Sequence, residues 1–212
     1  IILLSGCTVL GAEERFPSKE IEGIEVVELF PNYLISFDDY NKKDLKKIEE
    51  YQWWSTLHPI RLTKFKLTTF ASSTLNNSES YKSDNLCDGK IETAWVEGAK
   101  GDGIGEWVKV SIDAYSSLSE FTSTPFSLDE IAIMSGYGKS EKTWVENNRV
   151  KKLLVVAYSP RLSENEWVIY RLNLQDENKM QVFEIPNDKI GYSFTTMKKV
   201  VWLKIEEVYK GT

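Results

Sequence analysis

Histidine, cysteine and basic charge are all scarce in this chain of 212 residues. The sequence contains one histidine and two cysteines, and its 32 acidic residues outnumber its 26 basic ones. One histidine leaves few ways to build a histidine-ligated metal centre or a Ser/His/Asp triad, and two cysteines exclude a disulfide-rich scaffold. The net charge of −6 argues against a nucleic-acid partner, because nucleic-acid-binding proteins displace phosphate counterions with a basic face.

Glycine and proline are also sparse, at 12 and 6 residues, whereas 42% of the chain is hydrophobic and 27% is charged. This composition excludes a fibrous or disordered chain and is typical of a globular domain. Aromatic residues are plentiful, with 7 Trp, 10 Tyr and 9 Phe. Many tryptophans with almost no histidine favour a binding module over a hydrolase.

The first seven residues form an apolar run that ends in small residues and a cysteine, Leu4-Ser5-Gly6-Cys7. The run is far too short for a membrane-spanning helix, which needs about 20 apolar residues. It resembles the lipobox of a bacterial lipoprotein signal. The resemblance implies that residues 1–6 are a signal remnant, that Cys7 is acylated, and that residues 7–20 form a polar tether. The lipid would anchor the protein at the outer membrane or cell surface, with the periplasmic face as an alternative. The competing interpretation is an apolar strand with a buried cysteine.

Residues 21–60 are expected to form an N-terminal extension. Two apolar pieces flank Pro31-Asn32 and suggest extended structure. A helix is predicted over 41–53, with Asn41 as its N-cap. His58, which precedes a proline, is interpreted as a structural histidine.

From Lys64 onward the hydrophobic pattern changes to a period of two, which indicates β-strands. Residues 150–158 are almost continuously apolar, as is typical of a strand that is buried on both faces. Loops rich in Ser, Asn, Gly and Asp separate the strands, and no helices alternate with them. The sequence therefore predicts an all-β sandwich over 61–212.

An Asp-Gly turn followed by a tryptophan marks the most informative stretch of the chain. Residues 83–95 read Ser-Asp-Asn-Leu-Cys-Asp-Gly-Lys-Ile-Glu-Thr-Ala-Trp, and further blocks follow at 95–98, 101–107, 135–140 and 147–153. Over about residues 64–212 these blocks resemble the discoidin superfamily (coagulation factor 5/8 type C, galactose-binding-like). Within it they are similar to the bacterial NADase-type glycan-binding subfamily. The resemblance implies a jelly-roll β-sandwich that binds a glycan or glycoconjugate.

The same resemblance implies a structural Ca²⁺ as the one possible cofactor. The matching positions are Asp88, Thr93 and Glu206, with Glu207 as the neighbouring choice. Ca²⁺ takes six to eight oxygen ligands, so backbone carbonyls or water would complete the set. The alternative is that Asp88 only accepts backbone N–H bonds in an Asx-turn.

Aromatic residues in or beside the loops are candidates for stacking on a sugar ring, with polar neighbours holding its hydroxyls. The candidate ligand-binding residues are Tyr137, Lys139, Trp144, Asn148, Arg149 and Glu97. Trp95 is predicted to be a core residue. The sequence does not decide whether the rings of Tyr137 and Trp144 are exposed or buried. Asn148 has the alternative role of beginning the following strand.

Gly101, Gly103 and Gly105 alternate before a strand, but no helix follows, which excludes a phosphate-binding loop. These glycines predict a tight hairpin that brings Glu97 and Glu106 together. The two carboxylates are interpreted as structural, with a glycosidase pair as the alternative. Cys87 is predicted to be a small buried apolar residue.

The resulting hypothesis is a lipid-anchored protein that binds glycans without catalysis. A protein-binding adhesion or assembly module on the same fold is the first alternative, and a hydrolase of cell-wall glycans is the second. A lipid-binding discoidin domain is disfavoured by the net charge of −6.

Overall fold

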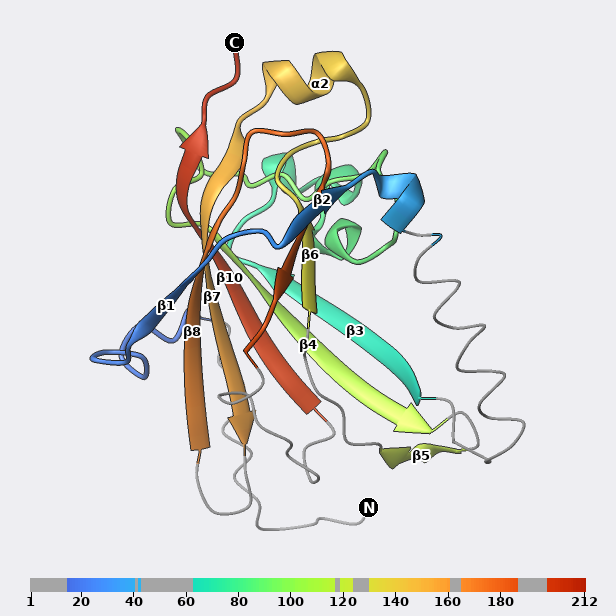
Figure 1. The fold of residues 1–212 in the computed structure, drawn as a ribbon, viewed down its shortest axis with the longest axis vertical. Coiled ribbons are helices and arrows are strands. Elements are labelled where there is room, and N and C mark those ends of the chain that lie inside the picture. Colours follow the sequence, from blue (N-terminus) through green and yellow to red (C-terminus); the bar gives the residue numbers. More distant parts are fainter. Residues whose placement is uncertain are drawn as a thin grey trace.

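Two β-sheets pack into a sandwich with short helices at one end (Figure 1). The computed structural model describes residues 15–40, 42, 63–116, 119–123, 130–160, 165–186 and 198–212. These residues form mainly β-strands in two sheets, which confirms the predicted all-β sandwich. No helix in these residues is long and apolar enough to cross a membrane.

The larger sheet has seven strands and supplies most of the core. Its order is β1 (Val26–Leu29), β8 (Asn165–Asn173), β7 (Arg149–Pro160), β10 (Lys198–Tyr209), β4 (Trp107–Ser116) and β3 (Thr63–Ala71), and β5 (Ser119–Ser123) pairs with β4. All pairs are antiparallel except β1 with β8, which is parallel. The smaller sheet is antiparallel, in the order β2 (Tyr33–Ile35), β9 (Met180–Glu184) and β6 (Glu130–Met134).

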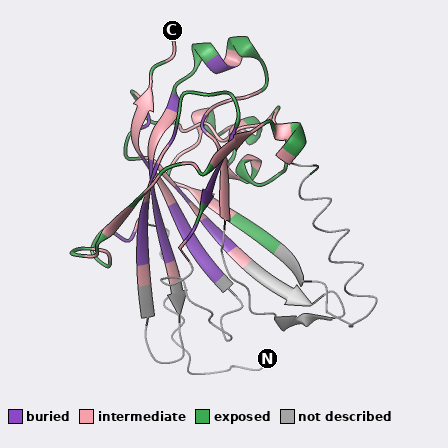
Figure 2. Cartoon of the chain, viewed as in Figure 1, coloured by how far each residue is buried: buried purple, intermediate pink, exposed green. Residues whose placement is uncertain are grey.

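Two apolar clusters lie on the two faces of the larger sheet, and its central strands are largely buried (Figure 2). Val155, Tyr170 and Phe183 are completely buried between the two sheets. Val156, the next residue of β7, is equally buried but belongs to a second apolar cluster on the outer face. The prediction that residues 150–158 form a strand buried on both faces is confirmed at these positions.

The second cluster is covered by the N-terminal segment. Phe16, Ile21 and Ile24 pack against this cluster, which includes Val156 and Trp202, on the outer face of the larger sheet. Phe16 therefore packs on the sandwich, within the polar tether that the sequence predicted over 7–20, while Ser18, Lys19 and Glu20 are exposed. Residues 1–14, with the proposed lipidation site at Cys7, lie outside the described residues, so lipidation stays a prediction.

The predicted N-terminal extension also contributes a strand to each sheet. β1 pairs with β8 through Val26 opposite Ile169, and β2 pairs with β9 through Tyr33 opposite Val182. Both strands satisfy backbone groups that would otherwise lie at open sheet edges. The segment before residue 61 is therefore joined to both sheets by strand pairing.

The first described helical residues are 37–40 and 42. The Ser36 hydroxyl accepts a hydrogen bond from the Asp39 N–H at 3.1 Å, so Ser36 acts as the N-cap and the helix starts before the predicted cap, Asn41. Residues 43–62, which hold most of the predicted helix and His58, lie outside the described residues.

A short helix that the sequence analysis missed, α2 (Glu141–Glu146), precedes β7 and is capped by Ser140 and Thr143 in a capping box. Three 3₁₀ turns, η1 (Leu75–Asn77), η2 (Glu79–Tyr81) and η3 (Ser83–Leu86), lie between β3 and β4.

Candidate functional site

Three connections and the C-terminus meet at one end of the sandwich (Figure 1), which we call the loop end. The connections are β3–β4, β6–β7 and β8–β9. They meet closely at Gly138, where an added Cβ would lie 2.8 Å from Ile91 and 3.4 Å from Asn178. Glycine is therefore required at residue 138 by close approach of the neighbouring loops.

Tyr137 and Lys139 flank this contact. The Tyr137 hydroxyl donates a hydrogen bond to the Glu92 carbonyl at 2.9 Å, and its side chain is half-buried. This bond ties the β6–β7 connection to the Asp-Gly turn region. Lys139 is exposed. Both candidate ligand residues thus remain accessible, with the tyrosine ring held in place.

Asn148 lies in a polar cluster beside the glycine-rich loop. Its amide donates to the Asp102 carboxylate at 3.4 Å, and its carbonyl accepts from the Gly211 N–H at 3.0 Å. Lys210 also pairs with Asp102. The predicted ligand residue Asn148 is therefore part of an internal network that joins the loop to the C-terminus.

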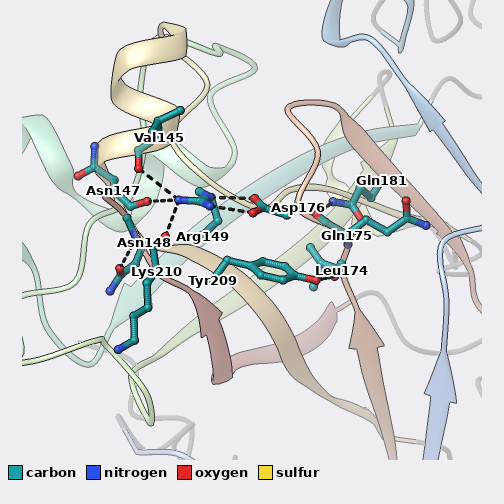
Figure 3. Close-up of polar contacts among 11 residues, drawn as sticks. Val145, Asn147, Asn148, Arg149, Leu174, Gln175, Asp176, Gln181, Tyr209 and Lys210 are labelled. Carbon is teal, nitrogen blue, oxygen red and sulfur yellow. Dashed lines mark hydrogen bonds and ion pairs between the residues drawn. The ribbon is translucent and has the colours of Figure 1, made fainter.

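Trp144 and Arg149 do not fit the predicted role of ligand contacts, because both are buried, with 5% and 8% of their surface exposed. Figure 3 shows that the Arg149 guanidinium is enclosed by protein acceptors. It forms two bonds to Asp176, at 2.9 and 2.8 Å, and it also donates to three backbone carbonyls. The reason is tertiary packing: Trp144 is buried in α2, and Arg149 satisfies carbonyls at the end of that helix and at Lys210 together with the Asp176 carboxylate.

The glycine-rich loop brings Glu97 and Glu106 into electrostatic contact, as predicted. Gly103 has φ of +72° and an added Cβ there would lie 2.7 Å from the Glu97 side chain, so the loop closes over this carboxylate only because residue 103 is glycine. Glu97 accepts a hydrogen bond from the Ala99 N–H at 2.6 Å. Glu106 accepts from the hydroxyls of Ser72 and Ser73.

Partial burial raises the pKa of Glu97, and the nearby Glu106 and Asp102 carboxylates raise it further, against the lowering effect of the Ala99 N–H. The folded protein therefore holds this proton more tightly than the unfolded chain does. By linkage, ionising Glu97 costs stability as the pH rises through its titration range.

We expect Glu97→Gln to stabilise the protein at pH 7.5 but not at pH 4, because glutamine keeps the acceptor for Ala99 and cannot ionise. The gain should be less than about 1 kcal/mol, since solvent screens a partly exposed group. Urea unfolding at the two pH values measures it, with Glu92→Gln, an exposed glutamate of the same loop end, as the control. An equal effect of Glu97→Gln at both pH values would contradict the assignment.

Of the predicted calcium positions, Asp88 and Thr93 are in contact with each other, whereas Glu206 has a different partner. Asp88 accepts hydrogen bonds from the Thr93 hydroxyl at 2.8 Å and from the Lys90 N–H at 3.0 Å, which is the predicted Asx-turn alternative. Glu206 instead pairs with Arg171 at 2.5 Å. In the described part of the chain, no group of three or more His, Cys, Asp or Glu side chains could hold a metal ion. Calcium binding at these positions stays a prediction.

Cys87 was predicted to be buried but is exposed. It follows η3 directly and its backbone N–H donates to the Asp84 carbonyl at 3.0 Å. The side chain thus lies at the edge of a surface turn rather than under it. Desolvation raises the pKa of its thiol, as do the nearby carboxylates of Asp84 and Asp88.

A hollow of about 500 Å³ opens where the glycine-rich loop meets the larger sheet. We call it the basal hollow. Its lining comes from the loop and from β7, β8 and β10, and comprises Ile104, Gly105, Lys152, Arg171, Lys204, Ile205, Glu206 and Glu207. The register of β10 against β7 shifts between Ile205 and Val208. Such a bulge re-aims side chains and explains why the consecutive residues Glu206 and Glu207 both line the hollow.

Ion pairs hold most of the charged groups of the basal hollow in fixed positions. Arg171 pairs with Glu206 at 2.5 Å and with Glu28 of β1 at 2.6 Å, and Lys152 pairs with Glu207 at 2.6 Å. The hydrogen bonds that Arg171 donates to Glu206 and Glu28 raise the pKa of its guanidinium. The Asn173 amide and Arg171 lower the pKa of Glu28. The hollow is open to solvent, and most of its charged donors and acceptors are paired with one another.

Two features of the basal hollow differ from this paired arrangement. Ile104 is 58% exposed, so it offers an apolar wall. Lys204 forms no ion pair with any described residue, and its ammonium lies 4.7 Å from the centre of the Phe16 ring. The sequence analysis overlooked both residues. The sequence did contain one signal for Lys204: it is the single basic residue within the apolar run 200–205.

A comparison with curated proteins finds no match to this chain. A family model does match it, over residues 63–212, and its description is NAD glycohydrolase translocation F5/8 type C domain. The description names a translocation domain rather than a catalytic one. The match covers more than half of the chain and spans every strand from β3 to β10, so the chain belongs to this family of F5/8 type C domains.

Proposed function

We propose that this domain binds a glycan in the basal hollow and leaves it chemically unchanged. The observation that carries the proposal is the lining of the hollow, which combines an exposed apolar wall at Ile104 with fixed charged donors and acceptors. A saccharide presents C–H faces and many hydroxyls, so it needs apolar contact together with hydrogen-bond partners of both kinds. Arg171 and Glu206 supply one donor and acceptor pair, and Lys152 and Glu207 supply another.

Fixed partners matter because each hydroxyl exchanges hydrogen bonds with water for bonds with protein, at a net gain of only about 1 kcal/mol each. Side chains that are already held by ion pairs lose little conformational entropy when a ligand binds. We therefore expect weak to moderate affinity for a single site.

Catalysis is not part of the proposal. Glu97 and Glu106, the pair considered for glycosidase chemistry, do not line the hollow. Two serine hydroxyls bind the Glu106 carboxylate, and this engagement is typical of a structural role.

The proposal is tested by titrating the full chain with neutral and acidic oligosaccharides, followed by calorimetry. Ile104→Ser removes the apolar wall and should weaken binding about tenfold, which corresponds to about 1.4 kcal/mol. Leu86→Ser is the matched control, because Leu86 is 45% exposed but does not line the hollow. It should leave the affinity unchanged.

Three outcomes would contradict the proposal in different ways. No binding across the panel would remove the glycan function and favour the protein-binding alternative. Binding that is insensitive to Ile104→Ser would move the site elsewhere, with Tyr137 and Lys139 as the next candidates. Release of shorter sugars that stops in Glu97→Gln would support the hydrolase alternative.

A further inference from the structure

Resting on the proposed function, we infer that the glycan carries a carboxylate and that Lys204 binds it. The basal hollow presents one more positive charge than negative charge. Its lining contains three cations, Lys152, Arg171 and Lys204, and two anions, Glu206 and Glu207. The excess of one positive charge occurs in a chain whose net charge is −6.

Adding the nearest flanking charges leaves this excess unchanged. Lys151 pairs with Glu207 at 3.0 Å and Glu28 pairs with Arg171 at 2.6 Å, which adds one charge of each sign. The positive charge without a carboxylate partner among the described residues is that of Lys204. A ligand with a single negative charge would neutralise it.

The position of Lys204 suits this role. Lys204 lies opposite Leu154 of β7, and Leu154 belongs to the cluster on the outer face of the larger sheet. The Lys204 side chain therefore points to that face, where its ammonium lies over the Phe16 ring. The ring stabilises the cation by a cation–π contact but accepts no conventional hydrogen bond. The three N–H donors of the ammonium therefore remain available to an anion in the hollow.

The opposing glutamates select the class of anion. Glu206 and Glu207 line the same hollow, and a doubly charged phosphate close to both would be repelled. A sugar acid has one negative charge beside several hydroxyls. Its carboxylate can contact Lys204 while its hydroxyls donate to the two glutamates, so every charged group of the hollow gains a partner of the right kind.

Two matched pairs of probes test the inference by calorimetry on the full chain. The first pair is galacturonic acid and its methyl ester, and the second is sialyllactose and its methyl ester. We expect at least one acidic probe to bind about tenfold more tightly than its neutral partner. Lys204→Gln should abolish that preference and Lys204→Arg should restore it. Lys66→Gln removes an exposed lysine of β3 that lies outside the hollow, and it should leave the preference intact.

Several results would overturn the inference. Equal binding of acidic and neutral partners, unchanged in Lys204→Gln, would overturn it while leaving the proposed function in place. Binding of no probe would reject both. Binding to vesicles of phosphatidylglycerol that depends on Lys204, without binding to either sugar acid, would replace the saccharide by a lipid headgroup. Thermal unfolding of each variant shows that loss of binding is not loss of fold.

Discussion

A chain that begins at residue 61 should lose more than about 5 kcal/mol of unfolding free energy relative to a chain that begins at residue 15. The shorter chain keeps nearly the whole span of the family match but lacks β1 and β2. It also lacks six apolar residues that are partly buried against one of the two clusters: Phe16, Ile21, Ile24, Val26, Val27 and Leu29. At about 1 kcal/mol for each partly buried side chain, the loss approaches the whole stability of a typical domain.

Two open sheet edges add to this cost. Removal of β1 exposes the backbone of β8 along residues 169–172, and removal of β2 exposes β9 along 180–182. Unpaired edges promote association between molecules. We therefore expect the shorter chain to unfold at much lower urea concentration and to aggregate.

The chain from residue 15 is the matched control, because it retains every described N-terminal contact. Where the shorter chain cannot be purified, Val27→Asp in the full chain tests the same strand by placing a charge against the inner cluster. Equal urea midpoints and equal slopes of unfolding free energy against urea, for the chains that begin at residues 15 and 61, would show that β1 and β2 contribute nothing to stability.

Replacing Arg149 by methionine should lower the free energy of unfolding by about 3 kcal/mol. The substitution leaves Asp176 without its bidentate partner, and it removes the Arg149 donor from the carbonyls of Val145, Asn147 and Lys210 (Figure 3). Breaking a buried ion pair on one side costs about 3–5 kcal/mol. The lower end of that range applies because the Asp176 side chain is 38% exposed.

The effect of Arg149→Met should depend on pH in a defined direction. Hydrogen bonds from Arg149 lower the pKa of Asp176, more than desolvation raises it. The contribution of the pair is therefore complete above the ordinary titration range of an aspartate and is lost as the pH falls through the lowered pKa. The difference between wild type and variant should be largest at neutral pH and shrink in acid.

Lys142→Met provides the control for loss of a positive charge. Lys142 pairs with Glu146 on the surface of α2 at 3.8 Å, with both side chains more than half exposed, and exposed pairs of this kind contribute about 0–1 kcal/mol. The loss of unfolding free energy in Arg149→Lys should lie between those of Arg149→Met and Lys142→Met, because one ammonium cannot replace a planar guanidinium with five donors. A cost for Arg149→Met no larger than that for Lys142→Met would show that the network adds no stability.

Much of the fold was predictable from local patterns. The alternation from Lys64 onward and the apolar run at 150–158 indicated strands, and the structure has β3 and β7 at these places. The glycines at 101, 103 and 105 predicted a tight loop near Glu97, and all three adopt positive φ. These features depend on steric and hydrophobic preferences that each segment carries in its own residues.

The predicted site was less accurate, because exposure depends on what packs over a side chain. Trp144 and Tyr137 have equivalent positions in the sequence, each in the connection before β7, yet α2 buries the first and leaves the second half-exposed. Arg149 looked like a ligand donor, but carbonyls from α2 and the C-terminus and a carboxylate from the β8–β9 connection surround it.

Local patterning thus settles which segments are strands, where the chain turns and that the domain is a sandwich, because these properties follow from neighbouring residues. The basal hollow follows from pairing between distant strands. Lys152, Arg171 and Lys204 come from three strands, and the bulge in β10 aligns Glu206 and Glu207 with them. Strand order and register bring these charges together, and no short stretch of the chain encodes them.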